Sequence, residues 1–376
     1  MKATGKIMTA FSTRTMTVLA AVALVLCSAC SKIERVHDDA QQELAFRPID
    51  RQMTKATSGL PEGTFFGLFA YHTELPGETP WNTAWQGTIN PYIQNAPFGN
   101  HGDYYAGWDP SSGTGTHHPY YWPFSGSLMF AGYSPYATVD AQGTATGGGP
   151  VTKVVFHKNV IEGASNPYLE IGYDMPDDNT IASMETTELL YFDVSSVNID
   201  PEDQQSKTTG KQETPVDIVF KHALSMVQFN VTHEYTSVSV TLTECIDKGT
   251  FYSGLTAGWL PDRTVNGAGQ LTSVKDYVFA RDETDKTFIT AKYVIPQYTT
   301  GWFEEIGEYV GDKMMLVVTI KDSVYDTQTS ETIQIPLEDY LDRIEMGKKH
   351  ILNLNIQKKP VEFGAPIEIT LNEVDI

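Results

Sequence analysis

Cysteine is scarce in this sequence, which holds only Cys27, Cys30 and Cys245 among its 376 residues. A disulfide framework of the kind that supports small secreted domains is therefore excluded. If the chain is cleaved before Cys30, as argued below, Cys245 is the one thiol left unmodified, and the fold must rest on burial of apolar side chains. Cys245 stands in the strand-like stretch TLTECI and is expected to be a small buried hydrophobe rather than a nucleophile.

Positive charge is also scarce. Lys and Arg number 26 against 47 Asp and Glu, which gives a formal net charge of −21. A surface of this sign repels the phosphates of nucleic acid and the headgroups of an anionic membrane, so both are excluded as partners. The apolar fraction of 41% and the aromatic fraction of 11% are too high for a disordered chain. The sequence therefore predicts well-packed cores under an acidic surface.

Long hydrophobic runs are missing as well. The apolar stretch Val18–Leu26 has nine residues, whereas a membrane-spanning helix needs about 20. Basic residues precede this stretch, and two small residues and then Cys30 follow it. This arrangement resembles a bacterial lipoprotein signal, which implies a signal peptide over 1–29, a lipid on the Cys30 thiol and a polar tether over 30–42. The alternative is an ordinary cleaved secretion signal in which Cys30 has no role.

Glycine and proline are abundant, with 30 and 20 residues, and break the chain into many short segments. Within these segments apolar and polar residues alternate, which is typical of strands with one buried and one solvated face. The clearest cases are VQFNV, VSVTL, TIQIPL, ILNLNI and PIEITL. The fold class is therefore predicted to be all-β, and only the run 337–347 predicts a helical turn or two. The stretch 200–214 lacks large apolar residues, so we expect two β-rich domains, 43–205 and 213–376.

Residues able to carry catalysis form no recognisable set. Ser225 lacks the glycines of a nucleophile elbow, and no phosphate-binding glycine loop is present. We therefore expect no enzyme activity and no cofactor. The one candidate metal set, whose members lie in loops, is His101, Asp103, His117 and His118. Solvated loop histidines are the favoured interpretation, so no metal is expected.

Aromatic residues are concentrated in the loop-rich region 74–122. They are Trp81, Trp85, Tyr92, Tyr104, Tyr105, Trp108, Tyr120, Tyr121 and Trp122. Flat rings on loops can stack on sugars, so Trp81, Trp85, Tyr105 and Trp108 are candidates for contact with a host or bacterial surface glycan. The alternative is that these rings cover the end of a β-sandwich, and the run YWPF (121–124) in particular is expected to be core.

Several segments together resemble the bacterial fimbrillin family, the subunits of type V pili. After the lipoprotein signal and the short run TKA, they are FGLFAY, YYWPFSGSLMFAGYSPYA, ELLYFDV, VDIVFKHALSMVQFNV, VIPQ and GKKHILNLNI. Their order and spacing cover nearly the whole chain beyond residue 30 and count for more than any single segment. The closing strand EITLNEVDI departs from the family, whose members often carry a Trp there.

The resemblance implies two tandem transthyretin-like β-sandwiches of the Greek-key type, and a structural or adhesive role in a cell-surface fimbria. It also implies export as a lipoprotein to the outer membrane, followed by trimming by an Arg/Lys-specific protease. Trimming removes the first strand, and a strand donated by another pilus subunit fills the groove that is left. The alternative is a surface lipoprotein that binds glycans without polymerising.

The stretch ELAFRPI (43–49) is the expected removable first strand. Leu44 and Phe46 alternate with smaller or polar residues, so both side chains lie on one face of an extended segment. Two apolar side chains on one face can fill two pockets of a neighbouring sheet. We therefore expect this segment to be paired in the precursor.

The processing site is expected just after this strand. Lys55 followed by Ala56 matches the basic residue and alanine of the family's site, and Arg51, beside an acidic residue, is a weaker alternative. Cleavage after Lys55 would leave 376 − 55 = 321 residues. The other outcome is an uncut tether, as expected of an anchor subunit or a glycan receptor.

Overall fold

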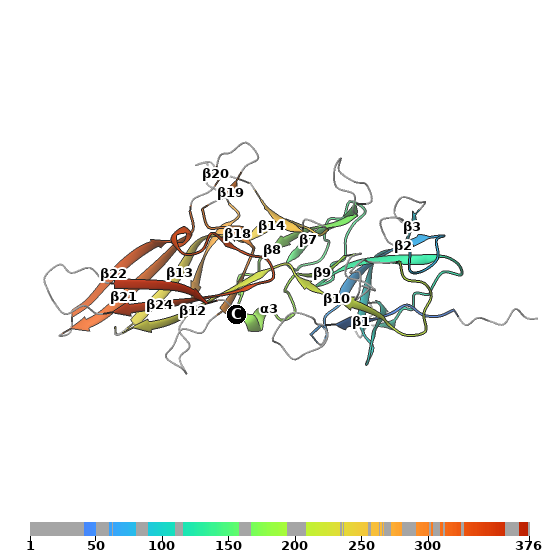
Figure 1. Ribbon diagram of the computed structural model, residues 1–376, viewed down its shortest axis with the longest axis horizontal. Helices are drawn as coiled ribbons and strands as arrows, with labels where there is room; N and C mark the ends of the chain where they lie inside the picture. The colour runs from blue at the N-terminus through green and yellow to red at the C-terminus, as the bar shows by residue number, and fades with distance from the viewer. Residues whose placement is uncertain are drawn as a thin grey trace, which may run out of the picture. The chain divides into compact units, whose positions relative to one another are not determined.

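The computed structural model (Figure 1) describes residues 41–49, 60–61, 63–79, 89–109, 116–157, 167–193, 208–233, 235, 237–254, 257–262, 264, 266, 272–279, 291–300, 302–303, 309–310, 313–324, 327–357 and 368–374. The chain divides into two units, Met1–Glu43 and Leu44–Ile376, and every contact discussed below lies within the second. Among the described residues the only helices are α3 (Ile181–Met184) and the 3-10 helix η4 (Leu337–Asp339). The predicted all-β class is confirmed. No helix within the described ranges is long and apolar enough to cross a bilayer.

The largest sheet formed by the described residues has nine strands. In chain order they are β1 (Ala45–Ile49), β2 (Phe66–Thr73), β3 (Ile89–Asn100), β4 (Tyr105–Asp109), β5 (Thr116–His117), β6 (Ser127–Ser134), β9 (Leu190–Phe192), β10 (Val216–Val219) and β11 (Lys221–His222). They lie in the order β10-β1-β4-β3-β2-β6-β9-β11, with β5 paired to β4. The predicted first strand is thus present, and it has a neighbour on each side.

Three four-stranded sheets follow. The first, in the order β15-β14-β8-β7, contains β7 (Val151–His157), β8 (Tyr168–Asp174), β14 (Lys248–Tyr252) and β15 (Gly258–Pro261). The second, in the order β17-β12-β24-β25, contains β12 (Ser225–His233), β17 (Ala291–Val294), β24 (Lys349–Gln357) and β25 (Glu368–Val374). The third, in the order β16-β13-β21-β22, contains β13 (Ser237–Ile246), β16 (Val274–Phe279), β21 (Met315–Val324) and β22 (Thr327–Pro336). Two further pairs join β18 (Gln297–Tyr298) to β23 (Arg343–Ile344) and β19 (Trp302–Phe303) to β20 (Tyr309–Val310).

The alternation seen in the sequence matches the burial of the strands in the second half of the chain. On β12, Val227 and Phe229 are fully buried while the residue between them is partly exposed, and on β13 Val240 is buried between partly or fully exposed neighbours. Phe229 meets Phe279 of β16 edge-on, with ring centroids 4.7 Å apart. Since these strands belong to different sheets, the inner faces of the β12 and β13 sheets share one core.

Strands from both sides of residue 213 meet in two of the sheets. β10 runs parallel to β1, and the two lie side by side although 170 residues separate Arg47 from its partner Asp217 (Figure 1). β11 likewise pairs with β9, and β14 pairs with β8. Both sheets therefore draw on both halves of the sequence. The division into domains 43–205 and 213–376, and their tandem transthyretin-like topology, stay predictions.

The run 337–347 is less helical than its sequence predicts. Only Leu337–Asp339 forms a 3-10 turn, and Arg343–Ile344 forms β23. Leu337, Leu341 and Ile344 are buried. Their spacing of four and three residues imitates the period of a helix, but each side chain reaches the core from a different local structure.

Candidate functional site

Two large apolar side chains are fully buried where β1 begins. Leu44 and Phe46 are both 0% exposed. The Phe46 ring meets three other rings nearly edge-on, at centroid separations of 6.0, 5.3 and 5.0 Å, those of Phe66, Phe98 and Phe130. Edge-to-face contacts set the positive edge of one ring against the negative face of another, and so stabilise beyond the burial of apolar area. The first strand therefore contributes directly to the core under the nine-stranded sheet.

Backbone pairing holds β1 along both edges. Phe46 lies opposite Val216 in the parallel ladder with β10 and opposite Tyr105 in the antiparallel ladder with β4. Arg47 also forms an ion pair with Asp217 at 2.7 Å, but the two side chains are 57% and 44% exposed. Solvent screens a pair of this kind, so it adds little to stability. Backbone hydrogen bonds and the buried rings hold the strand.

Removal of β1 would change the sheet in two ways at once. The facing edges of β10 and β4 would lose their backbone partners, and the Phe46 position would become an apolar slot lined by aromatic rings. A strand with large apolar residues at alternate positions fits such a slot, because it restores both the hydrogen bonds and the burial. The site is therefore suited to accept a strand.

The predicted lipid anchor and processing site lie outside the described residues. They are Cys30, Arg51, Lys55 and Ala56. Two of the four predicted glycan contacts, Trp81 and Trp85, lie outside these residues as well. The roles assigned to all six stay predictions.

Tyr105 and Trp108 are the predicted glycan contacts that the structure describes. Tyr105 is only 5% exposed, and its hydroxyl donates to the Leu60 carbonyl at 3.1 Å. Burial raises the pKa of Tyr105. This corrects the expectation for Tyr105, because its ring belongs to the core and offers no face to a sugar. Trp108 is half-buried, and its ring packs near that of Phe65 with centroids 6.2 Å apart.

The four residues considered as a metal set do not converge. His101 and His117 come together, with ring centroids 4.8 Å apart, but His118 instead contacts the ring of Tyr120. All three histidines, and Asp103, are exposed. In the part of the chain that the structure describes, no three metal-ligating side chains are grouped closely enough to hold an ion.

An ion-pair cluster lies on β7 and β8. The Glu170 carboxylate is 2.6 Å from Lys153 Nζ through one oxygen and 2.6 Å from His157 Nε2 through the other. Burial alone would raise the pKa of Glu170, but the hydrogen bonds and positive charges of its two partners outweigh burial, so the pKa lies below its ordinary value. The cluster ties two neighbouring strands together.

Cys245 lies on β13 and is 0% exposed. Burial raises the pKa of its thiol well above the ordinary value, and nearby acidic groups add to the effect. A thiol in this state is a poor nucleophile. The prediction that Cys245 is a small buried hydrophobe is confirmed.

Three exposed aromatic side chains gather around the loop before β6. Phe124 is 91% exposed, Tyr92 of β3 is 40% exposed and Tyr121 is 37% exposed. The Tyr92 hydroxyl donates to the Tyr121 carbonyl at 2.7 Å, which joins β3 to the loop. We refer to these three residues as the aromatic patch. The expectation that YWPF is core holds for Trp122, which is 5% exposed, but is wrong for Tyr121 and Phe124.

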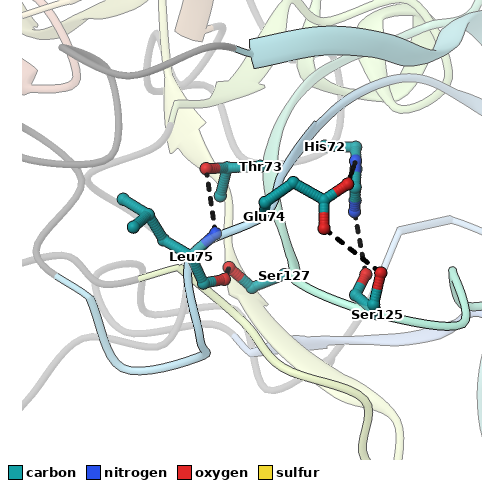
Figure 2. Close-up of polar contacts among 6 residues, drawn as sticks. All are labelled: His72, Thr73, Glu74, Leu75, Ser125 and Ser127. Carbon is teal, nitrogen blue, oxygen red and sulfur yellow. Dashed lines mark hydrogen bonds and ion pairs between the residues drawn. The ribbon is translucent and has the colours of Figure 1, made fainter.

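Polar contacts hold the loop 123–126 against the end of β2. Figure 2 shows His72 and Glu74 both pointing toward Ser125. His72 Nε2 donates to the Ser125 carbonyl at 2.8 Å, and the Ser125 hydroxyl donates to the Glu74 carboxylate at 3.2 Å. One serine is thereby fixed through its backbone and through its side chain.

The loop is also fixed where it enters β6. The Ser127 hydroxyl donates to the Leu75 carbonyl at 2.8 Å (Figure 2), and Ser127 is fully buried. Gly126 has φ +77°, and a Cβ added there would stand 2.1 Å from the Thr73 carbonyl oxygen. Only glycine fits this position. The turn residues Pro123 and Gly126 are the sequence signal that could have placed Phe124 outside the core.

A comparison with known protein families gives one match. A sequence profile described as Fimbrillin-like matches residues 54–373. The chain belongs to the fimbrillin-like family. The resemblance noted in the sequence is thereby confirmed for this fimbrillin-like protein. A search among curated proteins found no match.

Solved structures from Bacteroides are similar to this fimbrillin-like protein. A candidate cell adhesion protein from Bacteroides ovatus matches with a TM-score of 0.50 and 14% identity, over 89% of this chain and 97% of that chain. A fimbrial protein from Bacteroides vulgatus matches with a TM-score of 0.46 and 16% identity, over 88% of this chain and 98% of that chain. At this identity the first likeness bears on the fold alone.

Proposed function

We propose that this fimbrillin-like protein is a structural or adhesive subunit of a cell-surface fimbria. Membership of the family over residues 54–373 supports this assignment. The proposed location is the bacterial surface, first as an outer-membrane lipoprotein and then as part of the fimbrium. Its partners are other pilus subunits, joined by donated strands, and neither a cofactor nor nucleic acid takes part.

The observation that carries the proposal is the burial of β1. Leu44, the residue before β1, and Phe46 of β1 are 0% exposed, although both lie within a dozen residues of the expected processing site at Lys55. Proteolysis there would cut the covalent link between β1 and the rest of the sheet. The slot and the edges of β10 and β4 would then accept a strand from a second subunit.

Export and maturation complete the proposed sequence of events. Cleavage before Cys30 and lipidation of its thiol would hold the precursor at the outer membrane. Cleavage after Lys55 would then release a chain of 321 residues (376 − 55) that begins with Ala56. A protease needs an extended, accessible backbone at the bond that it cleaves. Arg47 is a poor cleavage site because the next residue, Pro48, lacks an N–H.

The test uses the soluble chain that begins at Ser31, treated with an Arg/Lys-specific protease. We expect a product whose amino terminus reads ATSGL, followed by SDS-resistant ladders that collapse on heating. Lys55→Gln should abolish both results, whereas Lys349→Gln, an exposed lysine on β24, should behave like the parent chain. Surface-sheared fimbriae whose subunits all retain a lipidated Cys30 would contradict the proposal.

A peptide experiment tests the slot itself. A synthetic peptide of residues 43–49 should compete with donated strands and shorten the ladders. The same peptide carrying Phe46→Ala should compete weakly, because it lacks the ring that meets Phe66, Phe98 and Phe130. Equal inhibition by the two peptides would show that the ring does not seat the strand.

The second candidate function is a surface lipoprotein that binds glycans without polymerising. The exposure of the aromatic patch favours it, since Phe124 is 91% exposed. A protein of this kind should remain a single band after protease treatment. The two candidates are thus separated by the ladder experiment.

A further inference from the structure

Phe124 projects from a loop that is anchored at both ends. On one side Trp122 is 5% exposed and packs edge-on against Phe130, with ring centroids 6.1 Å apart. On the other side Ser127 is fully buried at the start of β6. Between these anchors Phe124 is 91% exposed. A large apolar side chain is therefore held out in solvent by a loop whose ends are fixed.

The two residues that follow Phe124 are held in place, Ser125 by hydrogen bonds and Gly126 by its backbone conformation. The Ser125 carbonyl accepts from His72 at 2.8 Å, its hydroxyl donates to Glu74 at 3.2 Å, and Gly126 occupies a turn that excludes any Cβ. A preorganised loop loses little conformational freedom when a ligand binds. The contacts drawn in Figure 2 therefore fix Ser125, the residue that follows the exposed Phe124.

The other rings of the aromatic patch are connected to the same support. Tyr92 lies near His72, with ring centroids 6.4 Å apart, and its hydroxyl already donates to the Tyr121 carbonyl at 2.7 Å. Because this hydroxyl is engaged, the ring is the part of Tyr92 that a ligand can use. Tyr121 directly precedes the buried Trp122, so its backbone is fixed as well.

We propose that the aromatic patch, with Glu74 at its rim, binds a neutral glycan. A sugar ring has an apolar C–H face, which packs on flat aromatic rings, and a rim of hydroxyls, which donate to a carboxylate. The Glu74 side chain is 77% exposed and lies within hydrogen-bond reach of Ser125, the residue after Phe124. Glu74 and Phe124 are therefore both next to Ser125, the first through a hydrogen bond and the second along the chain.

Charge and size select this class of ligand. The net charge of −21 repels sialylated or sulfated glycans and anionic lipid headgroups. A folded protein partner would bury about 800 Å² on each side of an interface, more than three side chains can cover. The segment that carries Tyr121 also contacts the start of the first strand, because the Leu44 N–H donates to the Tyr120 carbonyl at 2.7 Å. Glycan binding is therefore tested on the chain that still carries this strand.

The test measures binding of the chain that begins at Ser31 to an array of neutral hexose oligosaccharides, with sialylated and sulfated forms on the same array. We expect binding to neutral members, and for the best of them a loss of affinity of about tenfold in Phe124→Ala, as for one lost aromatic contact. Glu74→Gln should weaken the same binding. Tyr340→Ala is the matched control, because Tyr340 is 39% exposed but lies beside η4.

Three results would overturn the proposal. The first is no binding to any neutral member of the array. The second is an equal effect of Phe124→Ala and Tyr340→Ala on affinity. The third is binding confined to sialylated or sulfated glycans. Circular dichroism of each variant checks the fold, which a change at a residue as exposed as Phe124 should leave intact.

Discussion

Truncation of Phe46 measures how firmly β1 is held. A buried phenylalanine replaced by alanine costs about 3–5 kcal/mol of unfolding free energy. Phe46 is 0% exposed and makes three edge-to-face contacts, so Phe46→Ala should lie in the upper part of this range, at about 4–5 kcal/mol. The loss of unfolding free energy in Phe46→Ala cannot exceed the free energy with which β1 docks onto the sheet. A larger loss would detach β1 while the rest of the sheet stays folded.

The measurement is guanidinium denaturation of the chain that begins at Ser31, followed by near-ultraviolet circular dichroism. Arg47→Ala is the matched control on the same strand. It removes an ion pair whose side chains are 57% and 44% exposed, and should cost less than about 1 kcal/mol. If Phe46→Ala costs no more than Arg47→Ala, the ring contacts do not hold the strand and the reasoning is wrong.

Three other changes have defined outcomes. Cys30→Ser should leave the precursor uncleaved and unlabelled by radioactive palmitate, and normal labelling would rule out the lipid anchor. A fragment that starts near residue 213 should fold on its own, although β10 loses its partner β1 and β14 loses its partner β8. A random-coil circular dichroism spectrum of this fragment would argue against separate domains. Because the pKa of Glu170 is lowered in the folded chain, the stability it adds is present above the ordinary carboxyl pKa and is lost as the pH falls through the lowered value. Denaturation midpoints of Glu170→Gln should therefore vary less in this acid range than those of the parent chain, and an unchanged pH profile would contradict the role of Lys153 and His157.

The alternation of apolar and polar residues along the sequence predicted where individual strands lie. The alternation of Leu44 with Phe46 located β1, and the same signal located β12 and β13. Burial on one face of a strand has a period of two, so a short window of sequence is sufficient to detect it. The partner of β1 was not predictable in this way, because the parallel ladder with β10 joins segments far apart in the chain.

Composition alone does not predict which aromatic residues are exposed. Tyr105 and Phe124 belong to similar aromatic, glycine-rich stretches, yet the first is 5% exposed and the second 91% exposed. Residue type does not decide this difference. Tyr105 sits within a central strand, whereas Phe124 follows Pro123 in a turn that Gly126 completes. The candidate binding surface therefore depended on turn geometry that aromatic content alone does not reveal.

The position of β1 between two neighbours has a mechanical consequence. A strand pulled along its own axis in this place is loaded in shear, since its backbone hydrogen bonds to β10 and β4 run across the direction of force. Bonds loaded in shear must break together, whereas bonds at a peeled edge break one after another. A filament whose subunits are joined by strands in this slot would resist traction from flowing liquid better than one joined at the edge of a sheet.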